Sequence, residues 1–114
     1  MKETRLGDFE EVIMLLVGIL GVNAYAFKIA DEFCTQTGRS VSIGAIHSTL
    51  SRLEDKGFVN SEMGGATAAR GGRRKRIYTI TALGQGVLTN SRDFKMSLWQ
   101  QFPGLATENL SFGF

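Results

Sequence analysis

Apolar residues recur at three- and four-residue intervals near the start of the chain. They occupy Phe9, Val12, Ile13, Leu16, Ile19 and Leu20. This spacing places them on one face of a helix, so we predict a first helix from Gly7 to Leu20. Leu15 and Val17 are apolar but lie off that face, which indicates a central helix covered on more than one side.

The same period continues after a short break at residues 21–23. Asn23 has a side chain that can cap a second helix. The apolar positions of this helix are Ala26, Ile29, Ala30 and Phe33. Gly38 is a natural place for it to end, because glycine adopts the left-handed conformation that closes many helices.

A third helix is predicted from Ser42, which can act as its N-cap, to about Lys56, just before Gly57. Its apolar face consists of Ile43, Ile46, Leu50 and Leu53. The opposite face is small and polar, with Gly44, Ala45, His47, Ser48 and Ser51, followed by Arg52. Such a face lets a helix backbone approach a DNA major groove closely. An ordinary solvated helix face is the alternative, and this helix by itself favours that alternative.

The second half of the chain begins with two runs of alternating residues. Residues 58–63 and 76–80 contain the β-branched and aromatic side chains typical of paired strands. Thr81 then resembles an N-cap, and a last helix follows as far as the break at Pro103. Its apolar positions form one strip of Leu83, Val87, Phe94, Leu98 and Phe102 and a second strip of Leu88, Met96 and Trp99. This is more apolar surface than a small domain covers, so we expect a homodimer.

Positive charge is concentrated between the two predicted strands. The net charge is only +2, but residues 63–92 contain six basic residues and no acidic ones. Five of them lie in the glycine-rich loop of residues 64–76: Arg70, Arg73, Arg74, Lys75 and Arg76. A flexible basic loop beside an otherwise acidic body indicates a polyanionic partner. A solvated charge run or a localisation patch is the alternative.

The order of these elements is that of a winged helix-turn-helix, an α+β fold that is mainly α. In this fold the third helix reads base edges, and the wing touches phosphates or enters the minor groove. We therefore expect double-stranded DNA as the partner. The predicted organisation is a DNA-binding domain over residues 1–80, a dimerisation helix over 81–103 and a poorly ordered tail over 104–114.

Other classes of function find little support in the sequence. The lone His47 and Cys34 cannot form a metal cluster, no catalytic triad is recognisable, and the glycine-rich loop lacks the spacing of a nucleotide-binding loop. We therefore expect no enzyme activity, no cofactor and no metal. Cys34 has no disulfide partner within the chain and is expected to be buried and reduced, as in a cytoplasmic protein. The apolar run 12–22 is too short to span a membrane, and acidic residues precede it where a signal peptide needs positive charge.

Residues 6–88 resemble the PadR family of bacterial transcriptional regulators. The resemblance rests on Asn23-Ala-Tyr-Ala-Phe-Lys-Ile-Ala, on Ser40-Val-Ser-Ile-Gly-Ala-Ile-His-Ser-Thr-Leu-Ser-Arg-Leu-Glu-Asp-Lys-Gly-Phe-Val, and on Arg70-Gly-Gly-Arg-Arg-Lys-Arg-Ile-Tyr-Thr-Ile-Thr-Ala-Leu-Gly. It implies a dimeric winged helix, joined through C-terminal helices, that usually represses transcription and is released by a small molecule. Because a single helix follows the wing, the chain resembles the short-tailed members. A winged helix that binds other proteins, without sequence-specific DNA contacts, is the alternative function.

The resemblance also implies roles for individual residues. On the recognition helix and its start, the expected DNA contacts are Ser40, Ser42, Gly44, Ala45, His47, Ser48 and Arg52. His47 stands where the family most often has tyrosine, and Arg52 has pairing with a nearby acid as its alternative role. In the wing, the expected contacts are Arg70, Gly71, Gly72, Arg73, Arg74, Lys75 and Arg76.

Further roles concern the second and last helices. Asn23 and Tyr25 are expected to contact phosphate, although Tyr25 could instead be a half-buried aromatic residue. The dimer interface is expected to contain Val87, Phe94, Leu98 and Phe102. Trp99 is a candidate for stacking on a planar apolar effector, with the dimer core as its alternative place.

Overall fold

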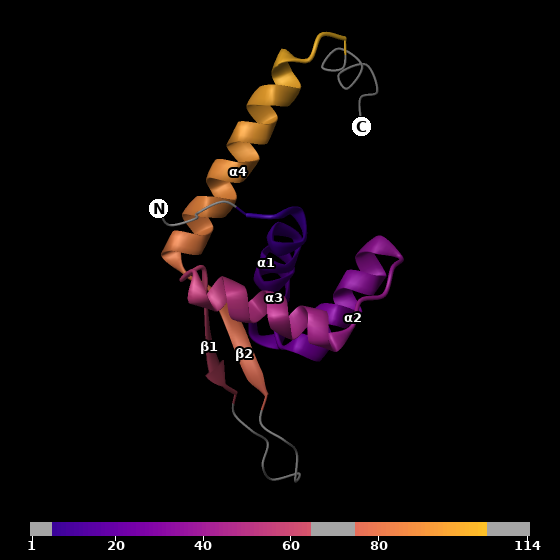
Figure 1. Cartoon of the computed structure of the whole chain (residues 1–114), viewed down its shortest axis with the longest axis vertical. Helices are drawn as coiled ribbons and strands as arrows, with labels where there is room; N and C mark the ends of the chain where they lie inside the picture. The colour runs from indigo at the N-terminus through magenta and orange to yellow at the C-terminus, as the bar shows by residue number, and fades with distance from the viewer. Residues whose placement is uncertain (1–5, 65–74, 105–114) are drawn as a thin grey trace.

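The computed structural model describes residues 6–64 and 75–104. The elements in chain order are α1 (Asp8–Leu20), the 3-10 turn η1 (Gly21–Asn23), α2 (Ala26–Thr37), α3 (Ile43–Asp55), β1 (Val59–Met63), β2 (Arg76–Ile80) and α4 (Ala82–Gln101). Helices α1 to α3 form the body, α4 extends away from it on one side, and the β1–β2 hairpin extends on the opposite side (Figure 1). This arrangement is the predicted winged helix-turn-helix.

The core lies where α1, α2, α3 and the hairpin meet. Its buried apolar residues include Ile13, Met14, Leu16, Val17, Ile29, Phe33, Ile46, Leu50, Leu53, Phe58, Val59 and Tyr78. The predicted face of α1 is wrong in part, because Val12 and Ile19 are 36% and 63% exposed while Met14, which lies off that face, is buried. The burial of Val17 agrees with the expected cover on a second side. The elements packed on α1 approach it from the Met14 side, so its buried face is rotated from the one that periodicity indicated. Leu15 is also exposed, which leaves an apolar strip of α1 open beside α4.

Local signals set most of the helix ends. The Ser42 hydroxyl accepts a hydrogen bond from the Ala45 N–H at 3.0 Å, and the Thr81 hydroxyl accepts one from the Gly84 N–H at 2.9 Å. Both predicted N-caps are confirmed. Gly38 ends α2 in the left-handed conformation with φ of 76°, as predicted.

The predicted capping role of Asn23 is wrong. Asn23 lies within η1, and the N-cap of α2 is Tyr25, whose side chain makes no capping hydrogen bond. The extra turn carries the chain along β2, where the Ala24 carbonyl accepts a hydrogen bond from the Tyr78 N–H at 2.9 Å. This long-range contact holds residue 24 outside the helix and delays the start of α2.

The two strands pair in antiparallel register, with Val59 opposite Ile80 and Met63 opposite Arg76. Side chains alternate between the two faces of a strand, so Arg76 lies on the same face as the buried Tyr78. The first strand begins one residue later than predicted, at Val59.

Helix α4 touches the body chiefly through its first turns. A side chain at Gly84 would place its Cβ 2.1 Å from the Phe58 carbonyl oxygen, so only glycine permits this close approach. Beyond this point α4 is largely exposed, although Ser91 and Lys95 still contact Glu11 of α1. No residue of the helix other than Gly84 is buried within the described range. No helix within residues 6–64 and 75–104 is long and apolar enough to cross a membrane.

The predicted burial of Cys34 is wrong, because this residue is exposed. Phe33 takes the core-facing position in that turn of α2. The next residue is rotated by about 100° around the helix axis, which turns it toward solvent.

Candidate nucleic-acid interface

The outer face of α3 is the predicted small, polar surface. Its exposed residues are Gly44, His47, Ser48 and Ser51, while Ala45 is half-buried. Ile46, Leu50 and Leu53 on the opposite face are fully buried, so the core fixes which side of α3 is presented. Ile43, expected on the apolar face, is 39% exposed because it begins the helix at the edge of the core.

A shallow depression lies between the start of α2, the N-terminal half of α3 and the base of the wing. It has a volume of about 160 Å³ and is lined by Tyr25, Ala26, Phe27, His47, Lys75, Arg76 and Tyr78. Four of these residues, Tyr25, His47, Lys75 and Arg76, were selected from separate parts of the sequence as DNA contacts. The fold brings them together on one surface.

Tyr25 and Lys75 contact each other directly within this surface. The Lys75 ammonium lies 4.4 Å from the centroid of the half-buried Tyr25 ring, within the range of a cation–π contact. The contact joins the wing to the start of α2 and keeps the ammonium at the rim of the depression.

Phe27 is a candidate contact that the sequence pattern did not reveal. It lies in the first turn of α2, lines the same depression and is 68% exposed. An exposed aromatic side chain among basic groups can contact the sugar or the thymine methyl of DNA. Its position off the apolar stripe of α2 was the available signal, because an off-stripe aromatic residue cannot be accounted for by the core.

Arg76 is held at the wing base by a chain of polar contacts. Its guanidinium donates a hydrogen bond to the Ser61 hydroxyl at 3.0 Å, and Ser61 donates one to the Glu54 carboxylate at 2.8 Å. Arg76 remains exposed, so its charge is available to a partner. The other predicted wing contacts, at positions 70–74, lie outside the described residues.

The remaining predicted contacts at the edges of this surface are exposed. Asn23 and Ser40 are exposed in η1 and in the connection between α2 and α3. Ser42 is exposed as well, but its hydroxyl already serves as the α3 cap.

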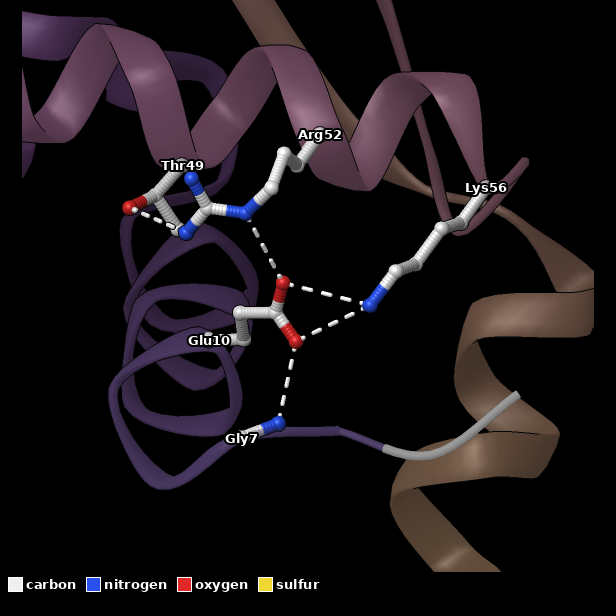
Figure 2. A network of polar contacts seen from close by, with 5 residues as sticks. All are labelled: Gly7, Glu10, Thr49, Arg52 and Lys56. Atoms are coloured by element: carbon white, nitrogen blue, oxygen red, sulfur yellow. Dashed lines mark hydrogen bonds and ion pairs between the residues drawn. The ribbon is translucent and has the colours of Figure 1, made fainter. Parts of the chain in front are cut away.

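Arg52 pairs with an acid, which was its alternative predicted role. Figure 2 shows Arg52 of α3 and Lys56 at the end of that helix extending toward the Glu10 carboxylate of α1. The Arg52 Nε lies 3.3 Å from one Glu10 oxygen, and the Lys56 Nζ lies 3.1 and 3.2 Å from the two oxygens. The Gly7 backbone N–H donates a further hydrogen bond to Glu10 at 2.9 Å. The Arg52 side chain is still 55% exposed, so part of the guanidinium faces solvent.

These contacts keep Glu10 ionised although its side chain is only 10% exposed. Burial alone would raise the pKa of this carboxyl group. The hydrogen bonds from Gly7, Lys56 and Arg52 outweigh burial, so the pKa of Glu10 lies below its ordinary value of 4.5. Glu10 is thus a fixed negative charge that holds the C-terminal half of α3.

The predicted dimer residues lie along α4. Phe94, Leu98 and Phe102 are 64%, 49% and 54% exposed, whereas Val87 is half-buried against the core. Trp99 is 52% exposed. It lines two open cavities, one of about 440 Å³ between α1 and α4 and one of about 250 Å³ beside Leu98 and Phe102.

Several solved structures share this fold. A PadR-like transcription factor from Bacteroides fragilis is similar with a TM-score of 0.67 and 23% identity, over 82% of this chain and 84% of that chain. RosR from H. salinarum is similar with a TM-score of 0.71 and 19% identity, over 94% and 89% of the two chains. PadR from Bacillus subtilis, in complex with operator DNA, is similar with a TM-score of 0.58 and 22% identity. The match covers 73% of this chain and 45% of that chain.

The sequence comparison is more specific than the likeness of folds. No curated protein sequence matches this chain significantly. The sequence profile of the PadR-like transcriptional regulators, however, matches residues 16–90, which include α2, α3, both strands and the start of α4. The chain therefore belongs to the PadR-like family of transcriptional regulators.

Proposed function

We propose that this chain is a sequence-specific DNA-binding regulator that acts in the cytoplasm as a homodimer and represses transcription until a small molecule releases it. One observation carries the DNA-binding part. Tyr25 at the α2 N-cap, His47 of α3, and Lys75 and Arg76 at the start of β2 surround one depression next to the polar face of α3. The similarity to a PadR that is complexed with operator DNA supports the same proposal.

Affinity and specificity have different sources in this proposal. Lys75, Arg76 and the other basic side chains of the loop neutralise DNA phosphates. This releases counterions and makes binding steeply dependent on salt. The exposed face of α3, centred on His47 and Ser48, lies in the major groove and reads base edges. Tyr25, at the start of α2, contacts the phosphate backbone of the DNA.

The homodimer forms through α4 in this proposal. Phe94, Leu98 and Phe102 present apolar side chains along a helix that the body leaves uncovered. Burying them against a second copy removes that surface from water and sets two α3 helices at a fixed spacing for a two-fold symmetric operator. Residues 1–80 then form the DNA-binding domain, 81–103 form the dimerisation helix, and 104–114 form a tail.

The proposed effector is a planar apolar molecule that stacks on Trp99. Support comes from the half-exposed indole and from the two cavities that it lines. Tryptophan fluorescence tests this directly, because Trp99 is the single tryptophan of the chain. Quenching by some members of a panel of planar aromatic compounds is expected, and a signal unchanged by the whole panel would remove the effector from the proposal.

DNA binding is tested with the DNA upstream of the protein's own gene, by fluorescence anisotropy at several salt concentrations. We expect tight binding that weakens steeply with salt, and much weaker binding to a scrambled duplex of the same composition. No binding even at low salt would instead favour a winged helix that binds other proteins. Equal binding to both duplexes would eliminate sequence specificity.

Two substitutions separate the roles of wing and helix in the same assay. Arg76→Ala should weaken binding to both duplexes and reduce the slope of log affinity against log salt by about 1. His47→Ala should change the preference between related sequences while keeping that slope. Arg92→Ala, which removes the same charge from α4, is the matched control and should leave the affinity and slope unchanged.

A further inference from the structure

Two consecutive carboxylates in the first turn of α1 bind different helices. Glu10 accepts hydrogen bonds from Arg52 of α3 and from Lys56 at the C-cap of α3, as described above. Glu11 accepts hydrogen bonds from α4, at 2.6 Å from the Lys95 ammonium and at 3.2 Å from the Ser91 hydroxyl. The recognition helix and the proposed dimerisation helix are thus held by adjacent residues of one helical turn.

The Glu11 contact sets the angle at which α4 leaves the body. The first anchor of α4 is its N-terminal turn, where the Thr81 cap and the close packing of Gly84 fix the helix on Phe58. Lys95 lies eleven residues after Gly84, about 16 Å farther along the helix axis. Two anchors at this separation define a direction, so a change at Lys95 turns α4 about its first turn.

The Glu10–Glu11 turn is held in place by its side-chain contacts and by a hydrogen bond from the backbone before it. Both side chains are largely shielded, with 10% of Glu10 and 14% of Glu11 exposed. Glu10 also accepts the Gly7 N–H, which ties the backbone before the helix to the same carboxylate. A shift of this turn therefore moves the Glu10 carboxylate oxygens to which Arg52 and Lys56 are bound. Because α3 is a single helix, its outer face moves together with Arg52.

We propose that Glu11 is a positioning residue that couples the angle of α4 to the orientation of α3 through Glu10. This coupling rests on the proposed DNA-binding function and describes how DNA binding would be regulated. The 440 Å³ cavity between α1 and α4 is lined by both Glu11 and Trp99. A molecule bound there changes the Lys95–Glu11 distance and so changes the affinity of α3 for DNA, which is a coupling between two sites.

The test is a double-mutant cycle in which Lys95→Gln is combined with Glu10→Gln. Lys95 lies on α4, away from the depression that carries the proposed DNA contacts. Lys95→Gln should weaken DNA binding about two- to fivefold, the range of a single partly exposed ion pair. In the Glu10→Gln background the same change should have no effect, because the coupling is already broken.

A matched control separates this effect from loss of charge. Arg92→Gln removes one positive charge from the same helix, where Arg92 pairs at 3.1 Å with its neighbour Asp93. This variant should bind DNA like the wild type. All variants are compared at protein concentrations at which sedimentation shows the same single oligomeric state. A change in dimerisation then does not contribute to the ratio of DNA affinities between variants.

A second measurement does not depend on DNA. Hydrogen exchange of the α3 amides over residues 49–55 should be faster in Lys95→Gln than in the wild type, and unchanged in Arg92→Gln. If the wild type bound no DNA while these exchange rates changed as expected, the proposed function would fail and the coupling would stand. Equal exchange and equal DNA affinity in the two single α4 variants, or a Lys95→Gln effect that persists undiminished with Glu10→Gln, would overturn the coupling.

Discussion

Glu10→Gln is the most informative single change, because it removes the charge that joins α1 to α3 and keeps the shape of the side chain. The amide oxygen of glutamine can still accept the Gly7 N–H, so the bond at the start of α1 is retained. The charge-assisted contacts with Lys56 and Arg52 are lost. Lys56 is 22% exposed, and we assign its contact about 1.5 kcal/mol. Arg52 is 55% exposed, so solvent screening reduces its share to about 0.5 kcal/mol.

The expected loss is therefore about 2 kcal/mol of unfolding free energy at pH 7, or roughly 8 °C in the unfolding temperature. Urea unfolding followed by circular dichroism measures it, with all samples at one protein concentration because the stability of the proposed homodimer would depend on concentration. Asp93→Asn breaks the largely exposed Arg92–Asp93 pair, whose side chains are 69% and 62% exposed, and is the control. It should change the unfolding free energy by less than about 0.5 kcal/mol.

The pH dependence of this difference tests its cause. The folded-state pKa of Glu10 is lowered below 4.5, so its contribution is fully present above that pH and is lost as the pH falls through the folded-state value. The difference in unfolding free energy between wild type and Glu10→Gln should thus be constant from pH 7 to about pH 5 and should shrink below pH 4.5. Equal urea midpoints at pH 7, or a gap that is unchanged at pH 3, would refute the assignment of this charge to the stability of the fold.

Three further predictions concern other parts of the molecule. Gly84→Ala should destabilise the fold by about 3 kcal/mol, measured by urea unfolding, because its Cβ would lie 2.1 Å from the Phe58 carbonyl oxygen. Cys34, which is exposed, should react with a thiol reagent in the native protein as fast as in urea, and strong native protection would contradict the exposed position. Phe94→Lys should shift the sedimentation coefficient toward the monomer, since Phe94 is 64% exposed on α4, whereas Gln100→Lys on the same helix should not.

The sequence by itself determined the features that depend on near neighbours in the chain. The Ser42 and Thr81 caps each accept a hydrogen bond from an N–H three residues away, and Gly38 ends α2 through its own backbone freedom. Residue type and spacing are sufficient for such contacts. The same kind of information gives the order of helices and strands and the polar outer face of α3. It also gives the concentration of basic residues between the strands.

Only the tertiary structure decided how the helices are rotated against one another. Periodicity identifies an apolar stripe but does not say which part of it neighbouring elements will cover, so Val12 and Ile19 are exposed and Cys34 is not buried. The delayed start of α2 likewise depends on a hydrogen bond from a strand more than fifty residues later in the chain, between Tyr78 and Ala24.

The candidate site shows the same division. Residue type and spacing indicate Tyr25, His47 and the basic loop as contacts in separate stretches of the chain. They do not indicate Phe27 or the acid that pairs with Arg52. That acid is Glu10, 42 residues away, and the neighbouring Glu11 binds Lys95 at a separation of 84 residues. No local pattern specifies such pairs, because each depends on the angle at which two helices cross after the core has formed.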